Sequence, residues 1–306
     1  MLATDVRMVL MTRLRCNIAF PAVFAAAVLV GCGGSSSPAD QRVEVVASFY
    51  PLAWAAEQVG GGDAVVTNLT PVGAEPHEID LAPDEIERLG AADVAIVMGR
   101  GFQPAVEAAT GDRSGATLAV LDEIPLPDDD SSDPHVWLDP ALMGAVADAI
   151  ATALIDADPG NAADYAANVA RFRRELDRLD TEYASGLADC ARRELFTSHD
   201  AFGWLARRYD LHAESIAGVS PDEEPTPQRL ADLKTLVEET GATTIYVETL
   251  VSPAIAATLA AEAGGLRTSV LNPLEGLSDA EIAEGADYVS VMRENLAALR
   301  DGLDCG

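Results

Sequence analysis

Histidine is scarce in this 306-residue sequence, and three of its four histidines lie where imidazole could act as a metal ligand. His77 lies in the turn after one β-rich run, His199 comes directly after another, and His135 lies in a proline-flanked loop. Neutral imidazole is a preferred ligand of Zn²⁺, so three converging imidazoles would suit a tetrahedral zinc site. No pair has the close spacing of an H-x-x-x-H pattern, so spacing by itself indicates the site only weakly. His212 matches no ligand pattern, and we expect it at the surface.

The fourth ligand position has several candidates. Asn272 directly follows a β-rich run over 267–271, and ligands of open α/β sheets bind at the carboxyl ends of strands. An amide oxygen is neutral and leaves the +2 charge of a metal ion uncompensated, whereas a carboxylate neutralises half of it. Glu248, Glu75 or a water molecule therefore remain alternatives, either as the ligand or in support of that position. If Asn272 lines the site, Asn272→Asp is expected to tighten Zn²⁺ binding.

The elements around these residues alternate between β-rich and helical patterns. In the first half of the chain, β-rich runs at 43–49, 64–69, 94–98 and 117–121 alternate with helical patterns at 52–59, 83–89 and 104–109. A second series runs through 195–198, 201–209, 213–219, 227–240, 243–248, 253–263 and 267–271 to a helix around 280–303. Such alternation predicts parallel sheets covered by helices. We therefore expect an α/β fold with two parallel-sheet lobes.

Between the two series lies a long segment without helix breakers. From 162 onward the chain has no proline and no glycine before Gly186. Its apolar residues recur every three or four positions, at Tyr165, Val169, Phe172, Leu176, Leu179 and Tyr183. This pattern predicts one rigid helix of about 25 residues, or ~38 Å. The expected organisation is an N-terminal lobe over 43–158, a linking helix over 159–189 and a C-terminal lobe over 190–306. Clefts between lobes are favoured ligand sites, so the metal cleft is expected between them.

The first 31 residues have the pattern of a signal peptide. Arg7, Arg13 and Arg15 precede an apolar run over 18–30, which is too short to span a bilayer as a helix. The run ends in Leu-Val-Gly-Cys, so it resembles a bacterial lipobox in which Cys32 becomes the lipid-modified first residue. Residues 32–42 would then form a flexible tether. These features predict an extracytoplasmic protein that contacts the cell membrane through a lipid anchor only.

Export also bears on the remaining cysteines. Cys16 belongs to the signal segment and Cys32 would carry lipid, which leaves Cys190 and Cys305. An even pair of cysteines in an oxidising compartment predicts a disulfide between them.

The charge of the chain excludes several partners. It has 50 acidic against 20 basic residues, a formal net charge of −30. Binding to nucleic acid or to an anionic membrane surface requires clustered Lys and Arg, so neither is expected. The 49% of apolar residues support a substantial core, which places the acidity at the surface.

The motifs around the histidines resemble those of the zinc/manganese-type solute-binding proteins of ABC importers. The motifs are Glu75-Pro76-His77, the segment 133–140 around His135, the segment 197–203 around His199, Tyr246-Val247-Glu248, and the segment 271–274. They occur in order over the chain from Val43 to Leu303. The one departure is at Asn272, where the family usually has a carboxylate.

The resemblance implies that His77, His135 and His199 bind the metal, and that a long helix joins the two lobes. It also implies a partner, the permease of an ABC importer, beside which the lipid anchor would hold the protein. Manganese-binding relatives tend to have Glu at the place of His199, so a third imidazole there favours Zn²⁺ over Mn²⁺.

The expected function is therefore high-affinity capture of Zn²⁺ outside the membrane by a monomer that delivers the ion to an ABC importer. A manganese- or iron-binding protein of the same family, or an adhesin, remains an alternative. A zinc hydrolase with three His ligands is a further alternative from another class. The sequence lacks both H-E-x-x-H and G-x-S-x-G, so we expect a binding protein and not an enzyme.

Overall fold

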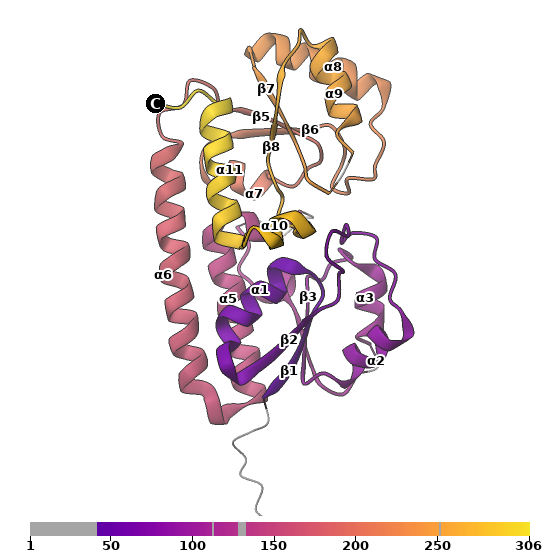
Figure 1. Ribbon diagram of the computed structural model, residues 1–306, viewed down its shortest axis with the longest axis vertical. Helices are drawn as coiled ribbons and strands as arrows, with labels where there is room; N and C mark the ends of the chain where they lie inside the picture. The colour runs from indigo at the N-terminus through magenta and orange to yellow at the C-terminus, as the bar shows by residue number, and fades with distance from the viewer. Residues whose placement is uncertain (1–41, 112, 128–132, 251) are drawn as a thin grey trace, which may run out of the picture. The chain divides into compact units, whose positions relative to one another are not determined.

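The computed structural model describes residues 42–111, 113–127, 133–250 and 252–306 (Figure 1). The first half of the chain contains a four-stranded parallel sheet. The predicted signal segment 1–31, the lipid site Cys32 and the tether, apart from Arg42, lie outside the described residues. The strands are β1 (Val43–Ala47), β2 (Ala64–Asn68), β3 (Val94–Val97) and β4 (Ala116–Ala119), in the order β2-β1-β3-β4. The helices between and after them are α1 (Tyr50–Gly60), α2 (Pro83–Ala91), α3 (Pro104–Ala109) and α4 (Val120–Glu123).

The second half repeats this plan. Its strands are β5 (Glu194–Thr197), β6 (His212–Ser215), β7 (Thr244–Val247) and β8 (Arg267–Val270), all parallel, in the order β6-β5-β7-β8. Its helices are α7 (Gly203–Arg208), α8 (Pro227–Thr240) and α9 (Ala254–Glu262). In each sheet the strand order reverses next to the first strand of its half, which is where open α/β sheets bind ligands. The predicted fold of two parallel-sheet α/β lobes is confirmed.

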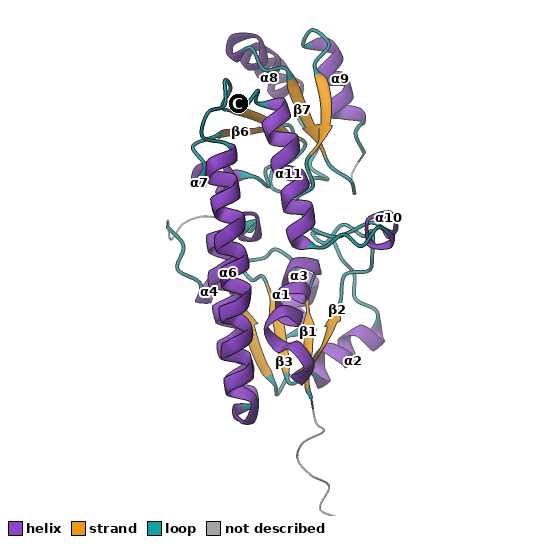
Figure 2. Cartoon of the chain, turned by 60° about the vertical axis from the view of Figure 1, so that its left-hand side comes forward, coloured by secondary structure: helices purple, strands orange, loops and turns teal. Residues whose placement is uncertain are grey.

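The predicted long helix is present as α6 (Ala162–Gly186), which follows α5 (Pro140–Ala157). Five of the six apolar residues that predicted it are buried, and Val169 is half-buried. α6 packs against α5 and against the last helix of the chain, α11 (Tyr288–Gly302). Figure 2 shows α11 beside the upper part of α6. Among the described residues, only α5 is long and apolar enough to cross a membrane. Half of it is buried and it packs on α1 and α6, as expected of a core helix.

The end of the chain differs from its predicted form. The expected helix around 280–303 is divided into α10 (Asp279–Ala283) and α11. Gly285 between them has a φ of +79°, a left-handed conformation that glycine adopts without steric cost and that ends a helix. Asp287 then starts α11 anew, because its side chain accepts a hydrogen bond from the backbone N–H of Ser290.

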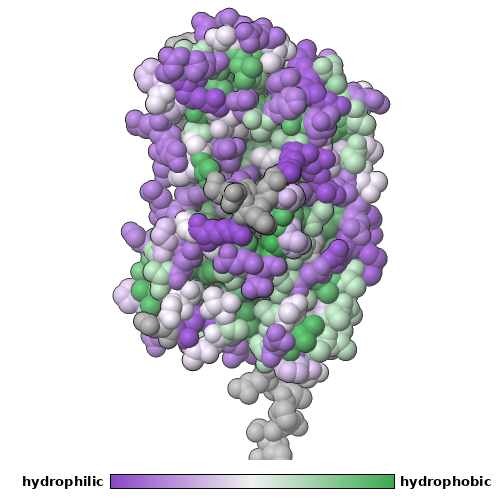
Figure 3. Space-filling model, turned by 180° about the vertical axis from the view of Figure 1, so that it is seen from behind, coloured by the Kyte–Doolittle hydropathy of each residue, from purple (hydrophilic) through white to green (hydrophobic). Residues whose placement is uncertain are grey.

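A continuous aromatic core joins α11 to the N-terminal lobe. Tyr288 stacks on Trp54 with ring centroids 4.9 Å apart, and its hydroxyl donates to the backbone carbonyl of Trp137 at 2.6 Å. The described residues consequently form a single compact unit. Hydrophilic side chains cover most of the face shown in Figure 3, in keeping with an acidic surface around an apolar core.

The predicted disulfide between Cys190 and Cys305 is present. It joins two residues separated by 115 positions, one just after α6 and the other just after α11. The disulfide therefore links the segments that follow the C-terminal ends of α6 and α11.

Candidate metal site

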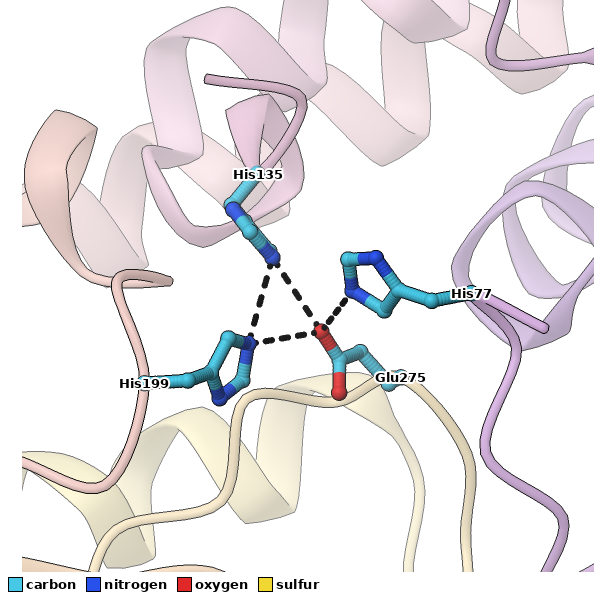
Figure 4. A group of neighbouring side chains, drawn as sticks. All are labelled: His77, His135, His199 and Glu275. Atoms are coloured by element: carbon cyan, nitrogen blue, oxygen red, sulfur yellow. Dashed lines mark hydrogen bonds and ion pairs between the residues drawn. The ribbon is translucent and has the colours of Figure 1, made fainter. Parts of the chain in front are cut away.

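Three histidines and one glutamate converge where loops of the two lobes meet (Figure 4). Nε2 of His77, His135 and His199 lies 3.0, 3.2 and 3.1 Å from Oε1 of Glu275. Nε2 of His135 and Nε2 of His199 are 3.3 Å apart. One donor atom from each of the four residues lies within 4.8 Å of the others. The structure thus brings the three predicted histidines together and adds a carboxylate that the sequence analysis did not select.

His77 is placed by the long loop that follows β2. Both carboxylate oxygens of Glu75 accept from the backbone N–H of His77, at 3.0 and 3.1 Å. Nε2 of Gln103, at the start of α3, donates to the carbonyl of Pro76 at 3.0 Å. The ring of Phe102 lies edge-on to the imidazole, with centroids 4.6 Å apart. Glu75, one alternative for the fourth ligand, therefore holds the backbone of this loop.

His135 lies just before the 3₁₀ turn Val136–Leu138, which leads into α5. Oδ1 of Asp133 lies 2.7 Å from Nδ1 of His135 and accepts from its backbone N–H at 2.9 Å. A carboxylate at Nδ1 fixes the proton on that nitrogen and turns Nε2 toward the site. His135 has no solvent-exposed surface.

His199 follows β5, and Glu248 follows β7, the neighbouring strand. Oε1 of Glu248 lies 2.8 Å from Nδ1 of His199 and accepts from its backbone N–H at 3.1 Å. Glu248 therefore stands behind His199, as Asp133 stands behind His135, and orients the imidazole instead of joining the four donors. Of the two roles left open for Glu248, the geometry corresponds to the supporting one.

Glu275 lies in the loop between β8 and α10 and is 1% exposed. Asn272 was one of several candidates for this position, but its amide forms hydrogen bonds with other groups. Its Oδ1 accepts from the N–H of Leu274 and its Nδ2 donates to Glu281, both at 2.7 Å. Glu275, and not Asn272, directs an oxygen at the histidines. A signal for it was present, because Glu275 is the one charged residue in the segment 271–277, directly after a strand.

The electrostatics of the four residues are those of a coupled buried cluster. Burial by itself would lower the pKa of His199, but the charge of Glu275 and hydrogen bonds to Glu248 and Glu275 raise it to about 10. The pKa of His135 is raised against the effect of burial by its hydrogen bonds to Asp133 and Glu275. Burial would raise the pKa of Glu275, yet the imidazoles hold it well below its usual range. Glu275 is therefore a carboxylate, and it favours positive charge at this point.

The donor set fits a tetrahedral cation. Ligand atoms at about 2.0–2.2 Å from a tetrahedral zinc ion are roughly 3.3–3.6 Å from each other. Four of the six separations are close to these edges: 3.0 to 3.2 Å from Oε1 of Glu275 to the three imidazole nitrogens, and 3.3 Å between Nε2 of His135 and Nε2 of His199. The other two lie within 4.8 Å. Three imidazole nitrogens and one carboxylate oxygen suit Zn²⁺, whereas Mg²⁺, Ca²⁺ and Mn²⁺ favour oxygen ligands.

A cavity of about 530 Å³ lies beside the site and reaches one of its four residues, His77. It is lined by His77, Phe102 and Arg100 from the N-terminal lobe and by Ser220 and Glu223 from the C-terminal lobe. His77 is 8% exposed, whereas His135 and His199 have no exposed surface. The cluster is thus closed to solvent except on the side of His77.

Known proteins share this architecture. A family model described as zinc-uptake complex component A periplasmic (ZnuA) matches residues 45–302. The high-affinity zinc uptake system protein ZnuA of Bacillus subtilis is 34% identical over an alignment of 300 residues, and the match covers 90% of this chain and 94% of that protein. The zinc-binding protein AdcA of Streptococcus pyogenes serotype M6 is 34% identical over an alignment of 290 residues, and the match covers 86% of this chain and 56% of that protein. The chain thus spans just over half the length of that streptococcal relative.

A solved structure extends the likeness to three dimensions. The Zn(II)-bound ZnuA-like domain of Streptococcus pneumoniae AdcA has a TM-score of 0.75 and 33% identity, and the match covers 86% of this chain and all of that chain. The family match, the relative matched along nearly its whole length and the shared fold lead to one conclusion. This chain belongs to the family of the periplasmic component A of zinc-uptake complexes.

Proposed function

We propose that this protein captures Zn²⁺ outside the cytoplasmic membrane and delivers it to the permease of an ABC importer. The observation that carries this proposal is the convergence of three imidazole nitrogens and one carboxylate oxygen within 4.8 Å. His77, His135, His199 and Glu275 are the proposed ligands, with Glu248 and Asp133 orienting two of the imidazoles. The names of the relatives support zinc as the ion.

The ligand chemistry also separates zinc from the alternatives. Mn²⁺ favours oxygen ligands, and only one of the four donors here is oxygen. The family is that of a component of an uptake complex, which supports binding and not hydrolysis. The adhesin alternative has less support, because the family model and the relatives at 34% identity are named for zinc uptake or zinc binding.

The remaining parts of the proposal concern how the protein is held. Residues 1–31 act as a signal peptide, Cys32 carries the lipid anchor, and the tether to residue 42 spaces the lobes from the membrane. The protein works as a monomer, with lobes at 43–158 and 190–306 and a linking helix at 159–189. The lipobox pattern supports the signal peptide and the anchor, and the position of α6 in the chain, after the first sheet and before the second, supports the division into lobes.

A competition titration tests the proposal. The purified mature protein is titrated with Zn²⁺ and Mn²⁺ against a chelator of known affinity, and so are His77→Ala, His135→Ala and His199→Ala. His212→Ala is the matched control, because the side chain of His212 is 70% exposed and lies outside the cluster. We expect the three site variants to lose more than about 100-fold in zinc affinity and the control to bind like the wild type. Equal binding by all four variants would reject the site, and tighter binding of Mn²⁺ by the wild type would reject zinc as the cargo.

A further inference from the structure

Asn272 is not one of the four residues that offer a donor atom to the metal. All of its polar groups form hydrogen bonds with residues in or next to the loop that contains Glu275. Its Oδ1 accepts from the N–H of Leu274 and its Nδ2 donates to Oε1 of Glu281, both at 2.7 Å. Its backbone N–H donates to Oδ1 of Asn295 at 2.8 Å, and its carbonyl accepts from Nδ2 of Asn295 at 2.7 Å. Asn272 is 4% exposed, so these bonds are made away from water.

The bond from Asn272 to Leu274 shapes the turn just before Glu275. Leu274 has a φ of +59° and is completely buried. A leucine in this left-handed conformation is uncommon and persists only where its surroundings determine it. A side-chain oxygen that accepts from the N–H two residues on is the device with which Asn stabilises such turns. The next residue is Glu275, whose carboxylate faces the histidines.

Glu281 closes the same loop at both ends. Its Oε1 accepts from Nδ2 of Asn272, and its Oε2 accepts from the N–H and the hydroxyl of Ser278, at 2.7 Å each. The loop 272–278 therefore begins and ends on one carboxylate, with Glu275 in its middle. Only a donor at position 272 can complete this arrangement, because both oxygens of Glu281 act as acceptors.

We infer that Asn272 is a positioning residue, whose amide holds the loop 272–278 closed and so sets the carboxylate of Glu275 for the metal. This inference rests on the proposed function, because it concerns the same zinc site. It assigns to the amide of Asn272 a role that a carboxylate at the same position cannot fill.

The variant Asn272→Asp separates this role from simple electrostatics. The introduced carboxylate can still accept from the N–H of Leu274, but its second oxygen would face the carboxylate of Glu281. An added negative charge near the cation would by itself tighten Zn²⁺ binding. A positioning role predicts weaker zinc binding instead, because repulsion between the two carboxylates opens the loop and displaces Glu275. We expect roughly 10- to 100-fold weaker zinc binding, the range seen when residues that orient metal ligands are lost.

The double variant Asn272→Asp/Glu281→Gln exchanges donor and acceptor and is the rescue. The amide introduced at position 281 can donate to the carboxylate introduced at position 272 and still accept from Ser278 with its oxygen. The net charge of the double variant equals that of the wild type. Glu281→Gln by itself is expected to weaken binding, because one amide oxygen cannot accept from both Asn272 and Ser278. The double variant should therefore bind zinc within a few-fold of the wild type, although each single change weakens binding.

A second cycle tests whether the effect passes through Glu275. In a Glu275→Gln background, Asn272→Asp should cause no further loss of zinc affinity. The visible spectrum of bound Co²⁺ should change in the same direction in Asn272→Asp and in Glu275→Gln, and return to the wild-type form in the double exchange.

Zinc affinity is measured by chelator competition for every variant, with thermal unfolding of the metal-free protein as a check on folding. Tighter zinc binding by Asn272→Asp, or a double exchange that binds as weakly as the single variants, would overturn the inference. If Asn272→Asp does not fold, Glu281→Gln and the double exchange still decide it by the same comparison. Failure of the wild type to bind zinc would reject the proposed function instead.

Discussion

Oε1 of Glu275 lies 3.0 Å from Nε2 of His77, although the two residues are 198 positions apart and belong to opposite lobes. The same oxygen lies within 3.2 Å of Nε2 of His135 and of His199. One carboxylate oxygen thus faces nitrogens from both lobes at a single point. A cation bound there replaces a set of charged hydrogen bonds between the lobes with metal–ligand bonds.

Glu275→Gln is expected to weaken zinc binding by about 100-fold or more, because it removes the one negative charge among the donors and an amide oxygen is a poorer zinc ligand. Chelator competition measures the effect. Glu223→Gln is the matched control, since Glu223 is an exposed carboxylate that lines the neighbouring cavity. A loss of similar size in both variants would mean that general charge, and not ligation, is responsible.

Zinc affinity is expected to rise with pH. With a pKa of about 10, His199 carries a proton on both nitrogens at neutral pH, and the metal must displace the proton on Nε2. The proton is bound below the pKa and lost above it, so competition with the metal weakens as pH approaches about 10. The apparent affinity should increase about tenfold per pH unit for each proton displaced. Calorimetry in two buffers of different ionisation enthalpy counts these protons, and release of none would contradict the assignment of His199.

Glu248→Gln is expected to reduce zinc affinity roughly 10-fold through His199. The amide oxygen can still accept from Nδ1, so the ring keeps its orientation while the charge behind it is lost. The second oxygen of Glu248 is buried without a hydrogen-bond partner among the described residues, so an amide there adds an unsatisfied donor. Glu214→Gln is a suitable control on the same sheet, because Glu214 pairs with Arg229 at the surface. If both variants bind zinc like the wild type, the hydrogen bond from Nδ1 of His199 to Glu248 does not affect how strongly His199 binds the metal.

Cys190→Ala/Cys305→Ala is expected to lower the free energy of unfolding by about 4–5 kcal/mol, because the loop that the disulfide closes is long and the unfolded chain gains freedom. The separation of 115 residues sets this value on the chain-entropy model. Zinc affinity should change little, since the loop of Glu275 is held by Asn295, Glu281 and Trp137. Denaturant unfolding of the metal-free proteins measures the first effect. An unchanged midpoint would show that the packing of α6 and α11 already supplies the constraint.

The regular parts of the molecule follow from local patterns. The βα alternation and the three-four spacing of Tyr165 to Tyr183 are repeated along many residues, so they predict both sheets and α6. The histidines were found because each is flanked by a recognisable motif. Cys190 and Cys305 were found by counting, since export leaves no other pair.

Glu275 was missed for a physical reason. Its loop has no periodicity, and the conformation of that loop depends on Trp137 and Asn295 from other parts of the chain and on Glu281 from the helix that follows it. The left-handed Leu274 cannot be read from sequence, because leucine rarely adopts that conformation. Asn272 was therefore named among the candidates for the fourth position, whereas the oxygen that faces the histidines comes from Glu275, three positions later. The division of the last helix depended on Gly285, which a helical pattern can tolerate at a cost.

The four donor residues are far apart in the sequence, and this determines whether folding or metal binding comes first. His135 and His199 are 64 residues apart, and Glu275 follows 76 residues after His199. No short stretch of the unfolded polypeptide offers two of these ligands together, so an extended chain has no high-affinity chelate to present. Loading must wait until both sheets have formed and the loop 272–278 has closed. The ion is then acquired where folding is completed, and not where the chain is synthesised.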